Sequence, residues 1–213
     1  MIEYWFPSPI IHTKLSNIRG TLNGILPYLN ELWSQPDALI PPWIGTSTGG
    51  SPNYSSFPTK ETMDQGGKLL HQRPEMKEAM DQIMPHVLDY FDLLKVDKNL
   101  KPEITDMWCQ TYISGIGFMH NHSEFLIGGG LYLECQGVQQ MVFEHPHALL
   151  YEPHIRSSFP KESLEITIDV EEGDLILWPG WMNHMVVAKA PEGWPNNYGS
   201  RISLPFMING VPQ

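Results

Sequence analysis

Three histidines are the residues whose types and spacing most clearly suggest chemistry. His120 and His122 form an H-x-H pair, and His184 comes much later, after the apolar run 174–178 and a Pro-Gly pair. On a β-strand, residues i and i+2 point to the same face, so His120 and His122 could present two imidazoles to one ion. A third imidazole from a distant strand would complete a facial set and leave other positions for substrate and O2. The spacing therefore predicts a metal site made of His120, His122 and His184.

Glu124 provides an alternative ligand, because His122-Ser-Glu124 is an overlapping H-x-E. With Glu124 as the second ligand, only Phe125 and Leu126 would remain to turn the chain before the strand expected from residue 127. That is too short for a crossing between two sheets about 10 Å apart. We therefore prefer His120 with His122, and whether Glu124 replaces either of them stays open.

Arg201 opens the last β-prone run of the chain, Arg201-Ile202-Ser203. Inside a barrel an arginine needs an anionic partner, because a desolvated and unpaired guanidinium is costly. A dicarboxylate cosubstrate would supply that partner. The alternative is a surface arginine at the start of a strand.

The elements that must position these residues fall into two parts. Apolar residues recur at helical spacing over 22–32 and again from Pro74 to Phe91, which predicts two helices, and residues 4–11 suggest an early strand. A long irregular loop is expected over 34–67. After Pro102 short β-prone runs follow at 107–113, 131–134, 140–143, 164–170, 174–178, 184–188 and 202–207. Helices followed by strands indicate an α+β protein with a sandwich-like barrel.

Length and composition fit one folded domain over 1–213, with 41% hydrophobic and 17% charged residues. We expect residues 1–100 to form a helical and loop elaboration and residues 101–213 the metal-binding half. A net charge of -11 argues against nucleic-acid or anionic-lipid partners. Two cysteines, no signal segment and no apolar run of about 20 residues predict a cytoplasmic protein that does not enter a membrane.

The motifs together resemble the 2-oxoglutarate/iron(II) oxygenase superfamily, in particular a largely uncharacterised group of phage-like and marine bacterial members. The matching stretches are His120-Asn-His122, Gly128-Gly-Gly-Leu-Tyr-Leu133, Glu172-Gly-Asp-Leu-Ile-Leu-Trp-Pro179 with Trp181 and His184, and Arg201-Ile-Ser203. Residues 5–9 and 47–50 also look like that group, so the resemblance covers nearly the whole chain.

This resemblance implies a double-stranded β-helix, a cupin-like jelly roll, with the N-terminal helices packed on its outside. It implies iron(II) held by His120, His122 and His184, and 2-oxoglutarate as cosubstrate. The distal carboxylate of 2-oxoglutarate would be bound by Arg201 and Ser203, with Tyr132 as a further contact. The implied reaction uses O2 to hydroxylate an unidentified small-molecule or peptide substrate, with release of succinate and CO2.

The sequence departs from the superfamily pattern in two ways. The superfamily uses H-x-D or H-x-E for its first two ligands, whereas His120 and His122 would make a site of three histidines. An insertion at 190–200 also lengthens the segment between His184 and Arg201, and it could form a lid. The tryptophans near these motifs could line a pocket: Trp108, Trp178, Trp181 and Trp194.

Two other interpretations remain. A cupin-type metal-dependent dioxygenase or isomerase fits Gly115 before the H-x-H and Pro179 before His184, but no glutamate stands at residues 126 or 127, where a cupin would need one. A non-catalytic jelly-roll binding protein would make the histidines incidental. The sequence also leaves a homodimer open.

Overall fold

Two antiparallel β-sheets and two α-helices make up the described chain. The computed structural model describes residues 8–33, 69–112, 114–146, 164–194 and 200–213. In chain order the elements are β1 (Ile11–Lys14), α1 (Ile18–Trp33), the short 3-10 helices η2 (Leu70–Gln72) and η3 (Pro74–Met76), α2 (Lys77–Leu93), β2 (Leu100–Met107), β3 (Gln110–Tyr112), β4 (Ser114–Ile116), β5 (Ile127–Cys135), β6 (Val138–Glu144), β7 (Glu165–Asp169), β8 (Asp174–Pro179), β9 (His184–Lys189) and β10 (Arg201–Pro212).

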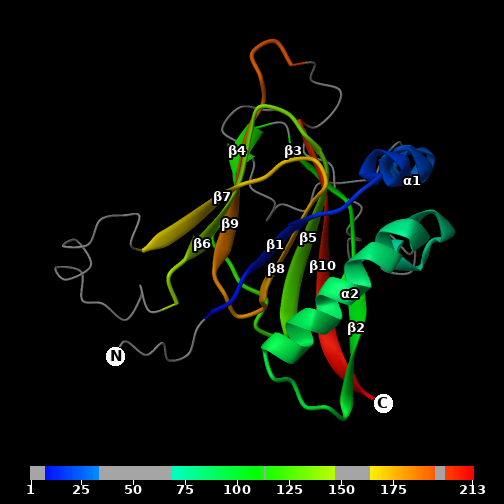
Figure 1. Cartoon of the computed structure of the whole chain (residues 1–213). Helices are drawn as coiled ribbons and strands as arrows, with labels where there is room; N and C mark the ends of the chain where they lie inside the picture. The colour runs from blue at the N-terminus through cyan, green and yellow to red at the C-terminus, as the bar shows by residue number, and fades with distance from the viewer. Residues whose placement is uncertain (1–7, 34–68, 113, 147–163, 195–199) are drawn as a thin grey trace.

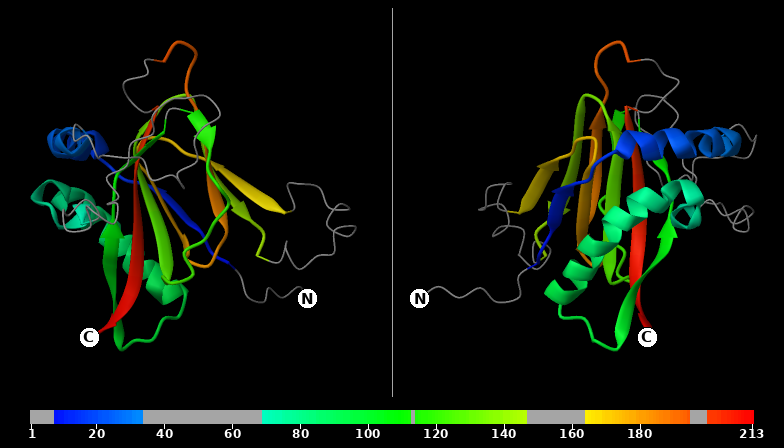
Figure 2. Two further views of the ribbon diagram at one scale, coloured as in Figure 1. Left: turned by 180° about the vertical axis from the view of Figure 1, so that it is seen from behind. Right: turned by 45° about the vertical axis from the view of Figure 1, so that its right-hand side comes forward.

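The larger sheet has the strand order β1-β8-β5-β10-β2, with β3 also pairing with β10, and the smaller sheet has the order β4-β9-β6-β7. Strands far apart in the sequence are neighbours, as where β10 lies between β5 and β2. Figures 1 and 2 show both helices on the outer side of the larger sheet. The predicted α+β organisation, with two N-terminal helices followed by strands, is confirmed, and the sheets are antiparallel.

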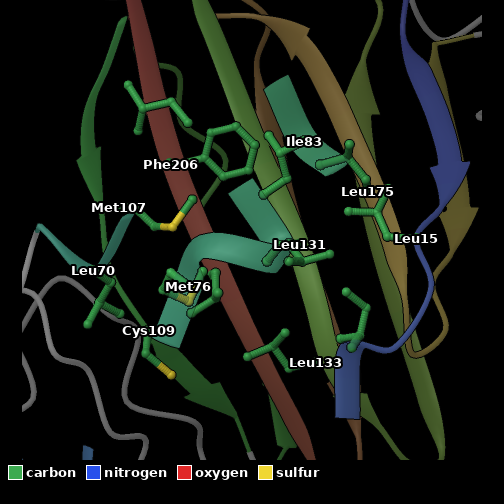
Figure 3. Packing of buried hydrophobic residues seen from close by; sticks show 14 of the residues in the cluster. Leu15, Leu70, Met76, Ile83, Met107, Cys109, Leu131, Leu133, Leu175 and Phe206 are labelled. Atoms are coloured by element: carbon green, nitrogen blue, oxygen red, sulfur yellow. The ribbon is translucent and has the colours of Figure 1, made fainter. Parts of the chain in front are cut away.

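The helices cover the larger sheet with the apolar faces that their spacing predicts. Ile25 and Leu29 of α1 and Ile83 and Val87 of α2 have no exposed surface. They share one core cluster with residues of β2, β5, β8 and β10, as Figure 3 shows for Ile83 near Leu175 and Phe206. Burying each such side chain stabilises the fold by roughly 1.5–3 kcal/mol. Within the described residues, neither helix is long and apolar enough to span a bilayer.

Side chains along β5 and β10 alternate between the side of the larger sheet that faces the helices and the inner side that faces the smaller sheet. Leu131 and Leu204 belong to the core cluster beneath the helices. Their chain neighbours Tyr132 and Ser203, which pair across the two strands, line the space between the sheets. Because side chains alternate along a strand, Arg201 points to the same inner side as Ser203. The fold thus brings together the residues that the resemblance linked to 2-oxoglutarate.

The glycine run in β5 makes room for an aromatic ring on each face of the sheet. A Cβ atom on Gly129 would lie 2.2 Å from the Phe206 ring, on the helix side. A Cβ atom on Gly128 would lie 2.7 Å from the Trp178 indole, on the inner side. Close approach of the two rings therefore explains why this central strand carries glycines that otherwise weaken a strand.

The strand boundaries differ from the prediction in the first half of the sheet. β2 begins at Leu100, before Pro102, and the expected strand 107–113 is divided into the end of β2 and the short β3. Pro102 is tolerated because β2 is an edge strand, where one side of the backbone needs no hydrogen-bond partner. The short β4 was not predicted. Residues 4–7 of the expected strand 4–11 and the whole expected loop 34–67 lie outside the described residues, and β1 begins only at Ile11.

Candidate active site

A cavity of about 560 Å3 lies between the two sheets. Strands β5, β8 and β10 of the larger sheet line one side, and Met141 of β6 and Val186 of β9 line the other. All three candidate histidines and Arg201 line this same cavity. A volume of this size is typical of sites for small molecules.

The three histidines form a compact cluster of nitrogen donors. Their ligand atoms all lie within 4.8 Å of one another. The ring centroids are 5.0 Å apart for His120 and His122, 4.4 Å for His120 and His184, and 5.3 Å for His122 and His184. In the part of the chain that the structure describes, Glu124 does not belong to this cluster. Imidazole is a preferred ligand of iron, nickel, copper and zinc, so the cluster can hold such a metal.

The histidines meet because the loop that carries His120 and His122 lies beside the start of β9, and the prediction that His120 and His122 share a strand is wrong. His120 forms an isolated bridge with His184, in which each backbone N–H donates to the other's carbonyl at 3.0 and 2.8 Å. The backbone N–H of His122 donates to Gly180 O at 2.8 Å, outside any strand. Backbone hydrogen bonds thus bring the ligands together without regular i, i+2 strand geometry.

Local hydrogen bonds fix the tautomers of two of the histidines. Nδ1 of His120 lies 2.8 Å from Phe118 O, and Nδ1 of His184 lies 3.0 Å from Met182 O. A carbonyl oxygen can only accept, so each Nδ1 must carry the hydrogen and donate it. Nε2 of both rings then keeps its lone pair for a metal, which is how protein groups commonly orient metal-binding histidines.

Burial keeps two of the rings neutral at physiological pH. Desolvation, with a further contribution from His120, lowers the pKa of His184 to about 3. Desolvation and His120 also lower the pKa of His122 to about 4, against an opposing effect of Glu124. A neutral imidazole is the form that binds a metal, so no proton has to be displaced first.

The low pKa of His184 predicts that the metal-free protein loses stability in acid. An unfolded histidine titrates near 6.5 and the folded His184 near 3, so between these values the unfolded chain binds the extra proton. The free energy of unfolding should therefore fall as the pH drops from 6.5 toward 3, and His184→Gln should lack this part of the dependence. Urea titrations of both proteins at several pH values would measure it; identical pH profiles would contradict the assignment.

Arg201 is a buried cation without hydrogen-bond partners on two of its nitrogens. Its residue is 3% exposed, and Nε and Nη1 have no hydrogen-bond partner among the described residues. The guanidinium carbon lies 4.9 Å from the Tyr132 ring centroid and 5.4 Å from that of Tyr112. Leaving such donors unsatisfied is costly, so this end of the cavity suits an anionic ligand.

The neighbours of Arg201 can donate further hydrogen bonds. Tyr132 is 1% exposed, and burial raises the pKa of its hydroxyl to about 12, so it keeps its proton at neutral pH. Ser203 Oγ donates to Gln110 O at 3.4 Å. The structure therefore brings Tyr132, Arg201 and Ser203 to one wall of the cavity.

Two polar residues of this wall, Gln110 and Tyr112, were missed by the sequence analysis. Tyr112 pairs with Arg201 and Gln110 pairs with Ser203 in the register of β3 and β10. Gln110 Nε2 donates to the Tyr112 hydroxyl at 2.7 Å. Their spacing of two residues was a signal that both side chains share a face, but the register that sets them beside Arg201 is not readable from sequence.

Of the four tryptophans expected near the site, Trp108 and Trp178 line the cavity, whereas Trp181 and Trp194 do not. Trp181 is 48% exposed. The Trp178 ring lies 4.8 Å from the His184 ring, between centroids, and so packs against this ligand.

Comparison with known proteins provides matches through structure only. No family model matches the sequence, and no curated protein matches it. The structure is similar to that of the epimerase SnoN in complex with Fe3+, alpha ketoglutarate and nogalamycin RO, with a TM-score of 0.60 and 12% identity over 97% of this chain and 82% of that chain. It is also similar to HygX from Streptomyces hygroscopicus with nickel and 2-oxoglutarate bound, with a TM-score of 0.52 and 12% identity over 95% and 83% of the two chains.

This chain has the fold of those enzymes. The carbocyclase SnoK, described as non-heme and alpha ketoglutarate dependent, is similar as well, with a TM-score of 0.53 and 11% identity over 97% of this chain and 82% of that chain. Structures with this fold therefore hold iron or nickel together with 2-oxoglutarate, and they include an epimerase and a carbocyclase.

Substitutions at His122 and Glu124 should separate the two ligand sets that the sequence left open. Glu124→Ala should retain metal, because its carboxylate lies outside the cluster, and His122→Ala should lose it. Metal stoichiometry after dialysis against a metal buffer measures both. The reverse result would make the site an H-x-E site.

Gly180 should be needed for the position of His122. A Cβ atom at residue 180 would lie 2.1 Å from Phe125 O and 2.7 Å from His122 O, both of which are backbone atoms. Gly180→Ala should therefore push the 122–125 segment away, weaken metal binding and destabilise the fold by about 1–3 kcal/mol, as other overpacked substitutions do. Metal titration and thermal unfolding would test this. Gly24→Ala is the comparison, because its Cβ atom would meet only the Glu75 side chain, at an ordinary contact distance of 3.4 Å.

Proposed function

We propose that this protein is a non-haem iron(II)- and 2-oxoglutarate-dependent oxygenase built on a double-stranded β-helix. The observation that carries the proposal is that one cavity contains two separate groups of residues, each suited to a different ligand. Three histidines cluster on one part of its wall, and a buried arginine with unsatisfied donors lies on another. A metal and a dicarboxylate together would complete both. The fold shared with SnoN and HygX supports the same conclusion.

The residues that line the cavity would have separate roles. His120, His122 and His184 would hold iron(II) through ring nitrogens whose tautomer is fixed for two of them. Arg201 would pair with the distal carboxylate of 2-oxoglutarate, since its planar fork matches a carboxylate and stays charged. Tyr132 would add a hydroxyl donor to that carboxylate, and Ser203 would do so by turning its hydroxyl away from Gln110 O, to which it donates at 3.4 Å. The apolar walls from Met141, Trp178 and Val186 would exclude water from the reacting atoms.

When bound, iron(II) and 2-oxoglutarate supply O2-dependent oxidation of a substrate, with conversion of 2-oxoglutarate to succinate and CO2. We propose hydroxylation of a small molecule or peptide as the reaction, and membership in the phage-like and marine bacterial group as the narrower affiliation. The epimerase and carbocyclase among the similar structures show that this fold also serves other outcomes.

Anaerobic reconstitution tests the proposal directly. Metal-stripped protein is mixed with iron(II) and then 2-oxoglutarate, and a weak visible charge-transfer band is expected only when both are present. Admission of O2 should then release succinate. The matched control is Arg201→Met, which should bind iron without developing the band. Iron binding with no band and no succinate in the parent would instead favour a cupin-type enzyme, and absence of metal binding would favour a non-catalytic protein.

A further inference from the structure

Three residues that line the cavity belong neither to the histidine cluster nor to the arginine wall. They are Glu124, Phe118 and Trp108. Glu124 is exposed, and no hydrogen bond or ion pair engages its carboxylate among the described residues. A free carboxylate in the cavity that holds the histidine cluster is available to a ligand that enters this cavity.

Phe118 adds an apolar surface close to the cluster of three histidines. Its residue is 65% exposed although it lines the cavity, so its ring can still lose contact with water when a ligand arrives. The Phe118 carbonyl accepts the hydrogen bond from His120 Nδ1 at 2.8 Å, which fixes residue 118 next to the ligand His120. An apolar group packed on Phe118 would therefore lie near the metal.

The charges around the cavity favour a cation over an anion. Arg201 is the only lysine or arginine among the described lining residues, and 2-oxoglutarate would occupy it. Asp106 and Glu124 are the lining carboxylates, and the whole chain has a net charge of -11. Iron(II) and the 2-oxoglutarate dianion would neutralise each other, so the remaining lining charges are Arg201 and the two carboxylates, which attract a cation more than a second anion. An aromatic ring such as Phe118 also attracts a cation through its face.

We propose that the prime substrate is a small molecule carrying an ammonium group on an apolar or aromatic body, with the ammonium paired to Glu124 and the body packed on Phe118. The proposal rests on the proposed function in one respect, the occupation of Arg201 by 2-oxoglutarate. It assigns to Glu124 a role in substrate selection that is separate from metal binding.

A matched set of three probes tests the assignment without requiring turnover: phenethylamine, 2-phenylethanol and 3-phenylpropanoate. They share an aromatic body and differ in charge. Binding to zinc-loaded protein with 2-oxoglutarate is measured by ligand-observed NMR titration. Phenethylamine should bind about three- to fivefold more tightly than 2-phenylethanol, as expected for a solvent-accessible ion pair, and 3-phenylpropanoate should bind most weakly.

Two variants and one control connect the preference to its residues. Glu124→Gln should bring phenethylamine and 2-phenylethanol to equal affinity, Phe118→Ala should weaken both, and Glu192→Gln, on an exposed residue that does not line the cavity, should change neither. Equal affinities in the parent, no phenethylamine binding, or a preference that survives in Glu124→Gln would overturn the proposal. Binding of the peptide N-acetyl-Ala-Lys-Ala-amide more tightly than phenethylamine would also overturn the proposal, and it would indicate a peptide substrate.

Zinc and 2-oxoglutarate affinities, measured first by calorimetry on the same samples, separate this proposal from the proposed function. If the parent protein binds neither zinc nor 2-oxoglutarate, the proposed oxygenase function is contradicted. If the parent protein binds zinc and Glu124→Gln does not, Glu124 is a metal ligand. That result would overturn only the substrate assignment.

Discussion

Arg201→Met should abolish measurable 2-oxoglutarate binding and, at the same time, raise the melting temperature of the ligand-free protein. The arginine is 3% exposed and leaves Nε and Nη1 unsatisfied among the described residues, so the ligand-free protein keeps a buried charge with unsatisfied donors. Replacing buried ionic groups with apolar residues of similar volume often stabilises a fold by about 1–4 kcal/mol. At roughly 2–4 °C per kcal/mol for a domain of this size, the shift is measurable by scanning calorimetry.

Arg201→Lys provides the graded comparison, because it keeps the charge and loses the planar fork. Loss of a charge-assisted pair with a buried partner costs on the order of 2 to 5 kcal/mol, so the lysine variant should bind 2-oxoglutarate roughly 30-fold or more weakly. Iron affinity should change little in both variants. Parent-like binding of 2-oxoglutarate by Arg201→Lys would mean that the carboxylate is bound elsewhere.

His184→Ala should lose the metal while the protein stays folded. His184 is the buried member of the cluster, and its removal leaves only the two donors of the 120–122 segment. The bridge to His120 uses only the backbone N–H and C=O of residue 184, which alanine retains. Metal content should therefore fall from one equivalent to nearly none, measured by elemental analysis after dialysis.

Circular dichroism and the urea midpoint serve as the control for His184→Ala. The imidazole packs against the Trp178 ring at 4.8 Å, so a modest loss of stability from the vacated space is expected. Full unfolding, or an unchanged metal content, would contradict the assignment of His184 as a ligand.

The helices could be predicted because their cores repeat at fixed local spacing. Leu22, Ile25 and Leu29 of α1 recur at the helical period, and the same holds for Ile83, Val87 and Phe91 of α2. The strand that carries Tyr132 and the one that begins at Arg201 were located by their β-prone composition. In both cases neighbouring residues contain the information.

Contacts between distant segments could not be predicted in the same way. The histidines were grouped correctly, yet the expected shared strand of His120 and His122 is replaced by a loop held to Gly180 and His184 through backbone bonds. Hydrogen bonds between backbone atoms place little constraint on the type of side chain, so the sequence does not reveal them. The exception is Gly180, where the close approach of the backbone requires glycine. The position of Gln110 and Tyr112 beside Arg201 depends on the β3–β10 register, which is set by three-dimensional packing.

The hydrogen bonds from His120 and His184 to the carbonyls of Phe118 and Met182 have a consequence for metal selection. Each bond spans two residues of the same segment, so both rings are oriented before any ion arrives. A preformed set of imidazole nitrogen donors, with no carboxylate in the cluster among the described residues, follows the Irving–Williams order and binds Ni2+, Cu2+ and Zn2+ more tightly than Fe2+. Cellular supply must then decide which ion is loaded. Protein purified aerobically should therefore carry zinc or nickel and be inactive, and a chelator followed by excess Fe2+ under anaerobic conditions should restore activity.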